Sequence, residues 1–98
     1  RDIVLTKTYP SCFRDTELQR QLTQRGVKQL VIAGMKTEFC VDTTCRAAPE
    51  LGFTAVLISD AHTTIDNPHL SAKDIIGHHN RTLAGPFVAL STAADWRF

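Results

Sequence analysis

Four short apolar runs alternate with segments of helical periodicity along the chain. The runs cover residues 3–6, 27–33, 53–59 and 87–90. They are rich in β-branched or aromatic residues and are bounded by glycine, proline or polar residues, which is typical of strands. Between them, apolar residues recur at every third or fourth position, which predicts helices. The pattern therefore predicts strands and helices in alternation.

The helices are expected to cover about residues 16–25, 37–51 and 72–84, with a short tail helix after residue 91 or 92. Pro49 lies in the last turns of the second helix and removes a hydrogen bond there, which predicts an early or kinked end. Ser71 and Asp74 resemble a capping box that begins the third helix. The segments 9–11 and 60–64 are expected to be loops.

This order predicts an α/β fold with a parallel sheet that helices cover on both faces. Right-handed crossovers are the default for such a sheet. Ligands bind at the carboxyl ends of the strands. Lys7, Gly34 to Cys40 and Asp60 to His62 all follow strands, so we expect them to meet in one cleft. No internal repeat or linker divides the 98 residues, so we expect one domain over residues 1–98.

The composition excludes several functional classes. With 43% hydrophobic and 21% charged residues, the chain resembles an ordinary soluble domain. A net charge of +1 gives no electrostatic basis for binding nucleic acid or an anionic membrane, and no apolar run is long enough to span one. We therefore expect no nucleic-acid partner and no membrane partner.

The cysteine count indicates the compartment and argues against a metal. Three cysteines without regular spacing do not form a disulfide framework, which favours reduced thiols in a cytoplasmic protein. The cysteines and histidines also lack the paired close spacing of zinc sites. We therefore expect no structural metal and no cofactor in this chain.

Cys40 is the main candidate for chemistry. It follows a buried strand and a turn at Gly34, and it lies in the first turn of the next helix if Thr37 is the N-cap. Unpaired amides and the positive end of the helix dipole favour a thiolate there, and the same amides could stabilise an oxyanion. The alternative is a small buried hydrophobe, which is common for free cysteine. Cys45, deeper in the helix, is expected in the core. Cys12 lies in a loop and could line the cleft, although a bystander thiol is the default expectation.

Other candidates have ordinary alternatives. Lys7 could neutralise a thiolate or donate a proton, or it could be a solvated lysine at a strand end. His62 could touch a substrate, or it could be a loop histidine bonded to the backbone. Phe13 and Phe39 could wall a substrate pocket, although core packing is the default for aromatic residues.

Residues 34–44 resemble the nucleophile motif of the isochorismatase-like cysteine hydrolases, which include nicotinamidases and other small-amide hydrolases. Segments around residues 7–18, 47–53, 59–64 and 75–80 resemble the same family. The resemblance implies a three-layer α/β/α sandwich with a six-stranded parallel sheet and an Asp-Lys-Cys triad. It makes Cys40 the nucleophile and Lys7 the triad lysine. It also implies a cis peptide at Met35–Lys36, which would aim the amides of Lys36 and Cys40 at the oxyanion.

The resemblance also implies that parts of the family domain are absent. The aspartate of the family, its general acid/base, lies on the first strand of the fold, whereas this sequence starts at the lysine strand. Asp2 is on the wrong strand for that role. We therefore expect residues 1–98 to be a partial domain, without the first strands and with a gap in its sheet. We expect it to associate with the missing N-terminal segment or to form a homo-oligomer.

Two functions remain open at this point. The first is a cysteine hydrolase that cleaves a C–N bond of the amide type in a small molecule. The second is a catalytically incomplete fragment or a non-catalytic interaction module that needs the upstream segment. Such a module would pair with another chain through an exposed sheet edge.

Overall fold

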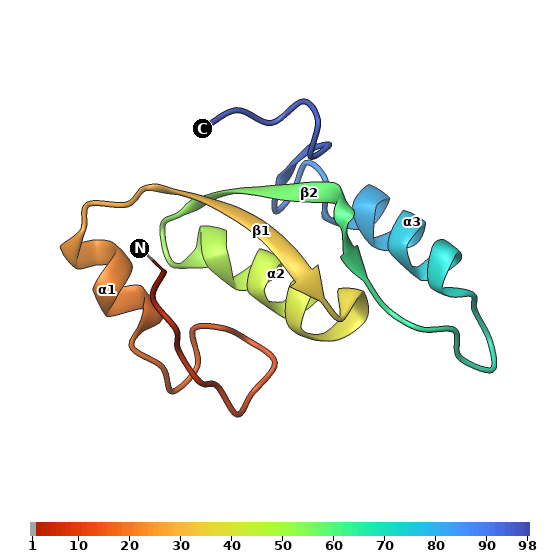
Figure 1. The fold of residues 1–98 in the computed structure, drawn as a ribbon, viewed down its shortest axis with the longest axis horizontal. Coiled ribbons are helices and arrows are strands. Elements are labelled where there is room, and N and C mark those ends of the chain that lie inside the picture. Colours follow the sequence, from red (N-terminus) through yellow and green to blue (C-terminus); the bar gives the residue numbers. More distant parts are fainter. Residues whose placement is uncertain (1) are drawn as a thin grey trace.

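The computed structural model describes residues 2–98, which form a small α/β unit (Figure 1). Its three strands lie parallel in the order β1-β2-β3. The expected α/β class with a parallel sheet is confirmed. In chain order, the elements are α1 (Leu18–Gln24), β1 (Gln29–Met35), the π-helical turn η1 (Thr37–Val41), α2 (Asp42–Glu50), β2 (Thr54–Thr63), α3 (Ala72–Leu83) and β3 (Ala89–Ser91).

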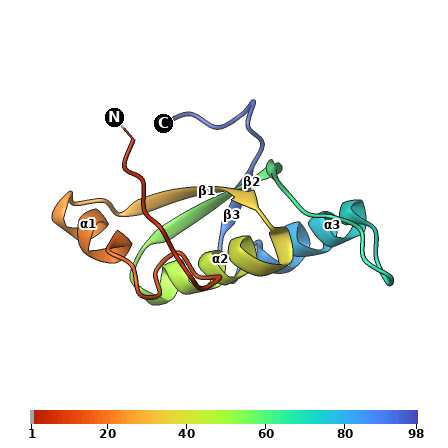
Figure 2. The same ribbon diagram turned by 60° about the horizontal axis from the view of Figure 1, so that its bottom comes forward.

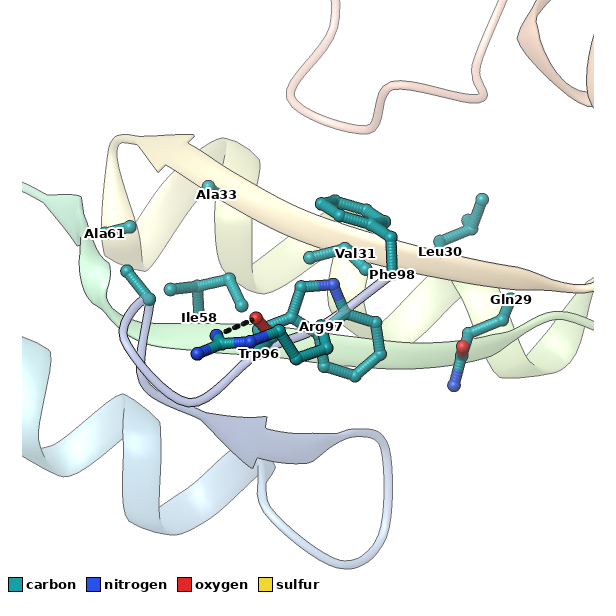
Figure 3. Close-up of a pocket in the computed structure, with 10 residues that line it drawn as sticks. Gln29, Leu30, Val31, Ala33, Ile58, Ala61, Trp96, Arg97 and Phe98 are labelled. Atoms are coloured by element: carbon teal, nitrogen blue, oxygen red, sulfur yellow. Dashed lines mark hydrogen bonds between the residues drawn. The ribbon is translucent and has the colours of Figure 1, made fainter.

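The helices α2 and α3 cover the same face of the sheet (Figure 2). Both contact β2, and the fully buried side chains of Cys45, Leu57 and Leu83 lie in the core on this side. On the opposite face, Trp96 and Phe98 of the C-terminal segment lie beside the sheet (Figure 3). The expectation of helices on both faces is therefore met on one face only within residues 2–98.

The strand β2 is longer than the sequence predicted. It was expected to end at Ser59, but it continues to Thr63, so the predicted loop over residues 60–63 is wrong. The physical reason is a bulge in the pairing with β1. Ile32 pairs with Leu57, but Gly34, two residues later, pairs with His62. The extra residues of β2 are accommodated as an irregularity, after which the two strands pair again.

Two other predicted elements are absent from the described residues. Residues 3–6 are not a strand, because they lack a ladder partner, and Val4 is 88% exposed. The segment after β3 makes only one turn, in which the N–H groups of Asp95 and Trp96 donate to the carbonyl of Thr92, and no tail helix follows.

The expected helix boundaries are mostly close to those observed. The Ser71 side chain accepts a hydrogen bond of 3.1 Å from the N–H of Asp74, so the predicted N-cap of α3 is confirmed. α2 ends at Glu50, one residue after Pro49. α1 begins at Leu18, later than expected.

Candidate active site

The segment between β1 and α2 holds Cys40 in a π-helical turn rather than in the first turn of an α-helix. The N–H of Val41 donates to the carbonyl of Lys36, five residues earlier, at 3.1 Å. Single π-helical turns are frequent at functional sites. The preceding peptide bond between Met35 and Lys36 is cis, and Gly34 has φ of +125°, a conformation that favours glycine.

The expected N-cap at Thr37 is not formed. The N-cap position is Lys36, and no side chain caps the turn. The Thr37 side chain is fully buried, and its hydroxyl lies 2.8 Å from Nδ1 of His62. The hydroxyl thus bonds to a strand residue instead of to its own helix.

Lys7 and Cys40 come together although 33 residues separate them in the sequence. The Lys7 ammonium donates a hydrogen bond of 3.1 Å to the Cys40 sulfur and another of 3.0 Å to the carbonyl of Tyr9. Lys7 is exposed and Cys40 is half-buried. The ammonium is placed to neutralise a thiolate, and the thiol remains open to a small molecule.

The backbone of Cys12 attaches the loop that carries Lys7 to α2 through Thr44, and a further bond to Thr16 fixes the loop internally. The N–H of Cys12 donates to Oγ1 of Thr44 at 3.1 Å, and the carbonyl of Cys12 accepts from Oγ1 of Thr16 at 2.6 Å. The ring of Phe13, the next residue in the loop, stacks on the ring of Phe53, with the ring centroids 5.9 Å apart. These contacts explain how a segment without helix or strand holds a lysine beside the thiol.

A small cavity of about 80 Å³ lies at the Lys7–Cys40 pair. None of the residues that line it carries a carboxylate, so the described residues place no triad aspartate at its wall. Cys12, for which the sequence left open a place in the cleft, lines this cavity. The lining residues are Lys7, Cys12, Ile32, Ala33, Met35, Cys40, Val41 and Thr44.

The three predicted substrate-pocket residues lie outside the wall of this cavity. Phe13 packs against the core through Phe53. Phe39 is 50% exposed, with the Lys36 ammonium 5.2 Å from its ring centroid. His62 is buried, and both ring nitrogens bond to side chains of the described chain.

Burial separates the third thiol from the other two. Desolvation raises the pKa of Cys45 to about 12, and the nearby negative charge of Asp42 acts in the same direction. Cys45 is fully buried, so its predicted place in the core is confirmed. It is therefore an inert structural thiol.

The carboxylate of Glu38, near Cys40 in the sequence, is stabilised in its charged form. The Thr64 hydroxyl donates a hydrogen bond of 2.6 Å to Glu38, and this bond lowers the pKa of Glu38 below its usual 4.5. The residue two positions before Cys40 is thus attached to the segment after β2.

Two further properties bear on function. Within residues 2–98, no three side chains of histidine, cysteine, aspartate or glutamate are grouped to hold a metal ion. Among the described helices, none has the length and apolar character to cross a membrane.

Comparison with known proteins identifies the family. Residues 1–83 match the family described as the isochorismatase domain. The chain belongs to the isochorismatase family.

Relatives with named activities are hydrolases. The chain is 41% identical over 96 residues to a streptothricin hydrolase of Streptomyces noursei. The aligned region covers 98% of this chain and 32% of the relative. It is 42% identical over 60 residues to the ureidoacrylate amidohydrolase RutB of Variovorax paradoxus. Here the aligned region covers 61% of this chain and 24% of the relative.

A solved structure supports the fold. The crystal structure of a cysteine hydrolase from Pseudomonas syringae pv. phaseolicola matches with a TM-score of 0.92 and 28% identity, over 96% of this chain and 46% of that protein. The chain thus spans about a quarter to a half of the length of these three relatives.

Proposed function

We propose that this chain carries the nucleophile and the supporting lysine of a cysteine hydrolase that cleaves a C–N bond of the amide type in a small molecule. The observation that carries the proposal is the contact of 3.1 Å between the Lys7 ammonium and the Cys40 sulfur. A thiolate is the nucleophilic form of cysteine, and an adjacent ammonium favours it. The hydrolase and amidohydrolase names of the relatives support the same reaction class.

In the proposed reaction, the Cys40 thiolate attacks the carbonyl carbon of the amide. The amides of Lys36 and Cys40 stabilise the oxyanion of the tetrahedral intermediate. The C–N bond then breaks, the amine leaves with a proton, and a thioester with Cys40 remains. Water hydrolyses the thioester and returns the thiolate.

The proton donor of this scheme is a carboxylic acid from outside the described residues. The cavity wall offers thiols, an ammonium, a hydroxyl and apolar groups, but no carboxylate. The family resemblance supplies an aspartate for that role. The three free cysteines fit a reducing compartment such as the cytoplasm.

The second candidate function is a non-catalytic or incomplete unit that needs another segment. Two observations favour it. The outer edge of β1 has no strand partner among residues 2–98. The sheet face opposite α2 and α3 bears a largely apolar groove of about 660 Å³ beside Val31, Ile58 and Trp96 (Figure 3). An N-terminal segment of the family domain, or a second copy of the chain, would cover both.

Ammonia release from a panel of small primary amides and ureido compounds tests the first candidate. The assay compares the chain alone with a chimera that adds the part of the Pseudomonas syringae relative that the chain does not cover. We expect the chimera to release ammonia and Cys40→Ser to lower the rate by about 10³-fold or more. Cys12→Ser is the matched control, because it removes a thiol from the same cavity.

Two results would contradict the hydrolase proposal. One is a chimera with correct fold that hydrolyses no member of the panel. The other is a Cys40→Ser variant that retains the rate of Cys12→Ser. Size-exclusion chromatography of the chain tests the second candidate function, the unit that needs another segment. That function predicts a dimer or a complex with the added segment. A monomer that binds no such segment would exclude it.

A further inference from the structure

A network of side-chain hydrogen bonds connects the π-helical turn η1, here called the nucleophile turn because it contains Cys40, to β2 and α3. Oγ1 of Thr37 lies 2.8 Å from Nδ1 of His62, and Nε2 of His62 lies 2.7 Å from Oδ1 of Asn80. The Asn80 amide in turn donates to the carbonyl of Ser59 at 3.1 Å. This hydrogen-bond network therefore joins η1, β2 and α3, which are distant in sequence.

The bond between Asn80 and Ser59 fixes the orientation of the Asn80 amide and thereby the hydrogen-bond role of His62 Nε2. Because Nδ2 of Asn80 donates to a carbonyl, its Oδ1 faces His62 and accepts. Nε2 of His62 then carries a proton, and in the neutral form of the ring Nδ1 accepts from the Thr37 hydroxyl.

The bulge in β2 places His62 where it can do this. Gly34 pairs with His62 only because the register between the strands shifts after Ile32. Bulges next to active sites often redirect one side chain. Here the buried imidazole lies directly beside the turn that begins three residues before Cys40.

A second bond anchors the neighbouring residue of the same turn. Glu38 accepts a hydrogen bond of 2.6 Å from Thr64, two residues after His62. Two consecutive residues of the turn are thus attached to His62 in β2 and to Thr64 directly after β2. The turn is fixed at its first two residues, and Cys40 lies two positions after Glu38.

We propose that His62 is a positioning residue that sets the orientation of Cys40 toward Lys7 by fixing Thr37 in the nucleophile turn. This inference rests on the proposed function of Cys40, and His62 itself touches neither the sulfur nor the cavity. It replaces the substrate-pocket role that the sequence suggested for His62.

Two substitutions of His62 separate positioning from bulk stability. In His62→Asn, the amide oxygen occupies the place of Nδ1 and can still accept from Thr37. In His62→Gln, the longer amide can reach Asn80 but leaves the Thr37 hydroxyl without its acceptor. His79→Asn is the matched control, because His79 is a half-buried histidine of α3 whose Nδ1 donates to the carbonyl of Ile75 at 2.8 Å.

The readout is the rate of alkylation of Cys40 by iodoacetamide, divided by the rate for Cys12 in the same full chain. We expect His62→Gln to lower this ratio by about tenfold, since small misplacements of a reacting group have large effects on rate. His62→Asn and His79→Asn should remain within about twofold of the parent chain. The thermal midpoint of each variant is measured in parallel.

The inference is overturned if the asparagine and glutamine variants give the same ratio, or if the ratio follows the thermal midpoint across all variants. Alkylation of the buried Cys45 reports any variant that fails to fold. If His62→Gln does not fold, Thr37→Val decides, because it keeps the volume and removes the hydroxyl; an unchanged ratio there refutes the inference. Amide hydrolysis is not part of the readout, so this outcome is independent of the test of the proposed function.

Discussion

Alkylation of the native chain should leave Cys45 unmodified while Cys12 and Cys40 react. The perturbation is iodoacetamide at pH 8 without denaturant. The pKa of Cys45 is raised from 9.0 to about 12, and each pKa unit is a tenfold change in the thiolate fraction below the pKa. Three units correspond to about a 10³-fold smaller thiolate fraction at this pH. The side chain is also fully buried, which excludes the reagent.

Peptide mass spectrometry at timed intervals measures the three rates in one sample. Cys45 should react at least about 10³-fold more slowly than Cys12, and its label should appear only as urea unfolds the chain. A Cys45→Ala variant identifies its peptide and serves as the control. Native labelling of Cys45 within tenfold of Cys12 would refute the placement of this thiol in the core between the sheet and α2.

The remaining predictions concern other parts of the fold. Lys7→Met should lower turnover of the active chimera by about 10²-fold, whereas the same change at Lys73, exposed on α3, should have no effect. Thr64→Val should raise the pKa of Glu38 toward 4.5 in an NMR titration. Since folding lowers this pKa, the bond stabilises the fold at higher pH, and its contribution is lost as the pH falls through the lowered value. An unchanged titration would exclude Thr64 as the cause. Leu83→Ala should lower the free energy of unfolding by about 2–5 kcal/mol in urea, because this side chain is fully buried; a loss under 1 kcal/mol would contradict its place in the core.

The apolar pattern predicted the elements that the core requires. The strands near residues 29–35 and 54–59 and the cap at Ser71 follow from local periodicity and local hydrogen bonding. The resemblance predicted the cis peptide position and the pairing of Lys7 with Cys40, and the structure has both features. These are properties of short segments or of a motif that the sequence displays directly.

What the sequence did not predict depends on contacts between distant residues. The polar residues 60–63 resemble a loop, and only pairing with β1 after a register shift makes them a strand. Thr37 has the sequence position of an N-cap residue, but its hydroxyl bonds to the buried imidazole of His62 in β2 instead of to its own helix. Residues 3–6 have strand composition, but a strand also requires a neighbour to complete its hydrogen bonds, and residues 2–98 provide none.

The π-helical turn has no signal in the apolar pattern. Its bond from Val41 to Lys36 spans five residues, and side-chain bonds of Thr37 to β2 and of Glu38 to the residue after β2 accompany it. Local periodicity predicts an α-helix there. The prediction that Cys40 lies in the first turn of an α-helix is therefore wrong, because it lies in a π-helical turn that precedes α2. The orientation of the candidate nucleophile is thus a tertiary property of the fold.

The covalent intermediate tests the central claim most directly. The active chimera is mixed with a small amide and quenched in acid, and the mass of each cysteine peptide is measured. A thioester on Cys40, absent from Cys40→Ser and retained in Cys12→Ser, is the result that the Lys7–Cys40 geometry predicts. Turnover without any acyl group on Cys40, or with the acyl group on Cys12, would contradict it.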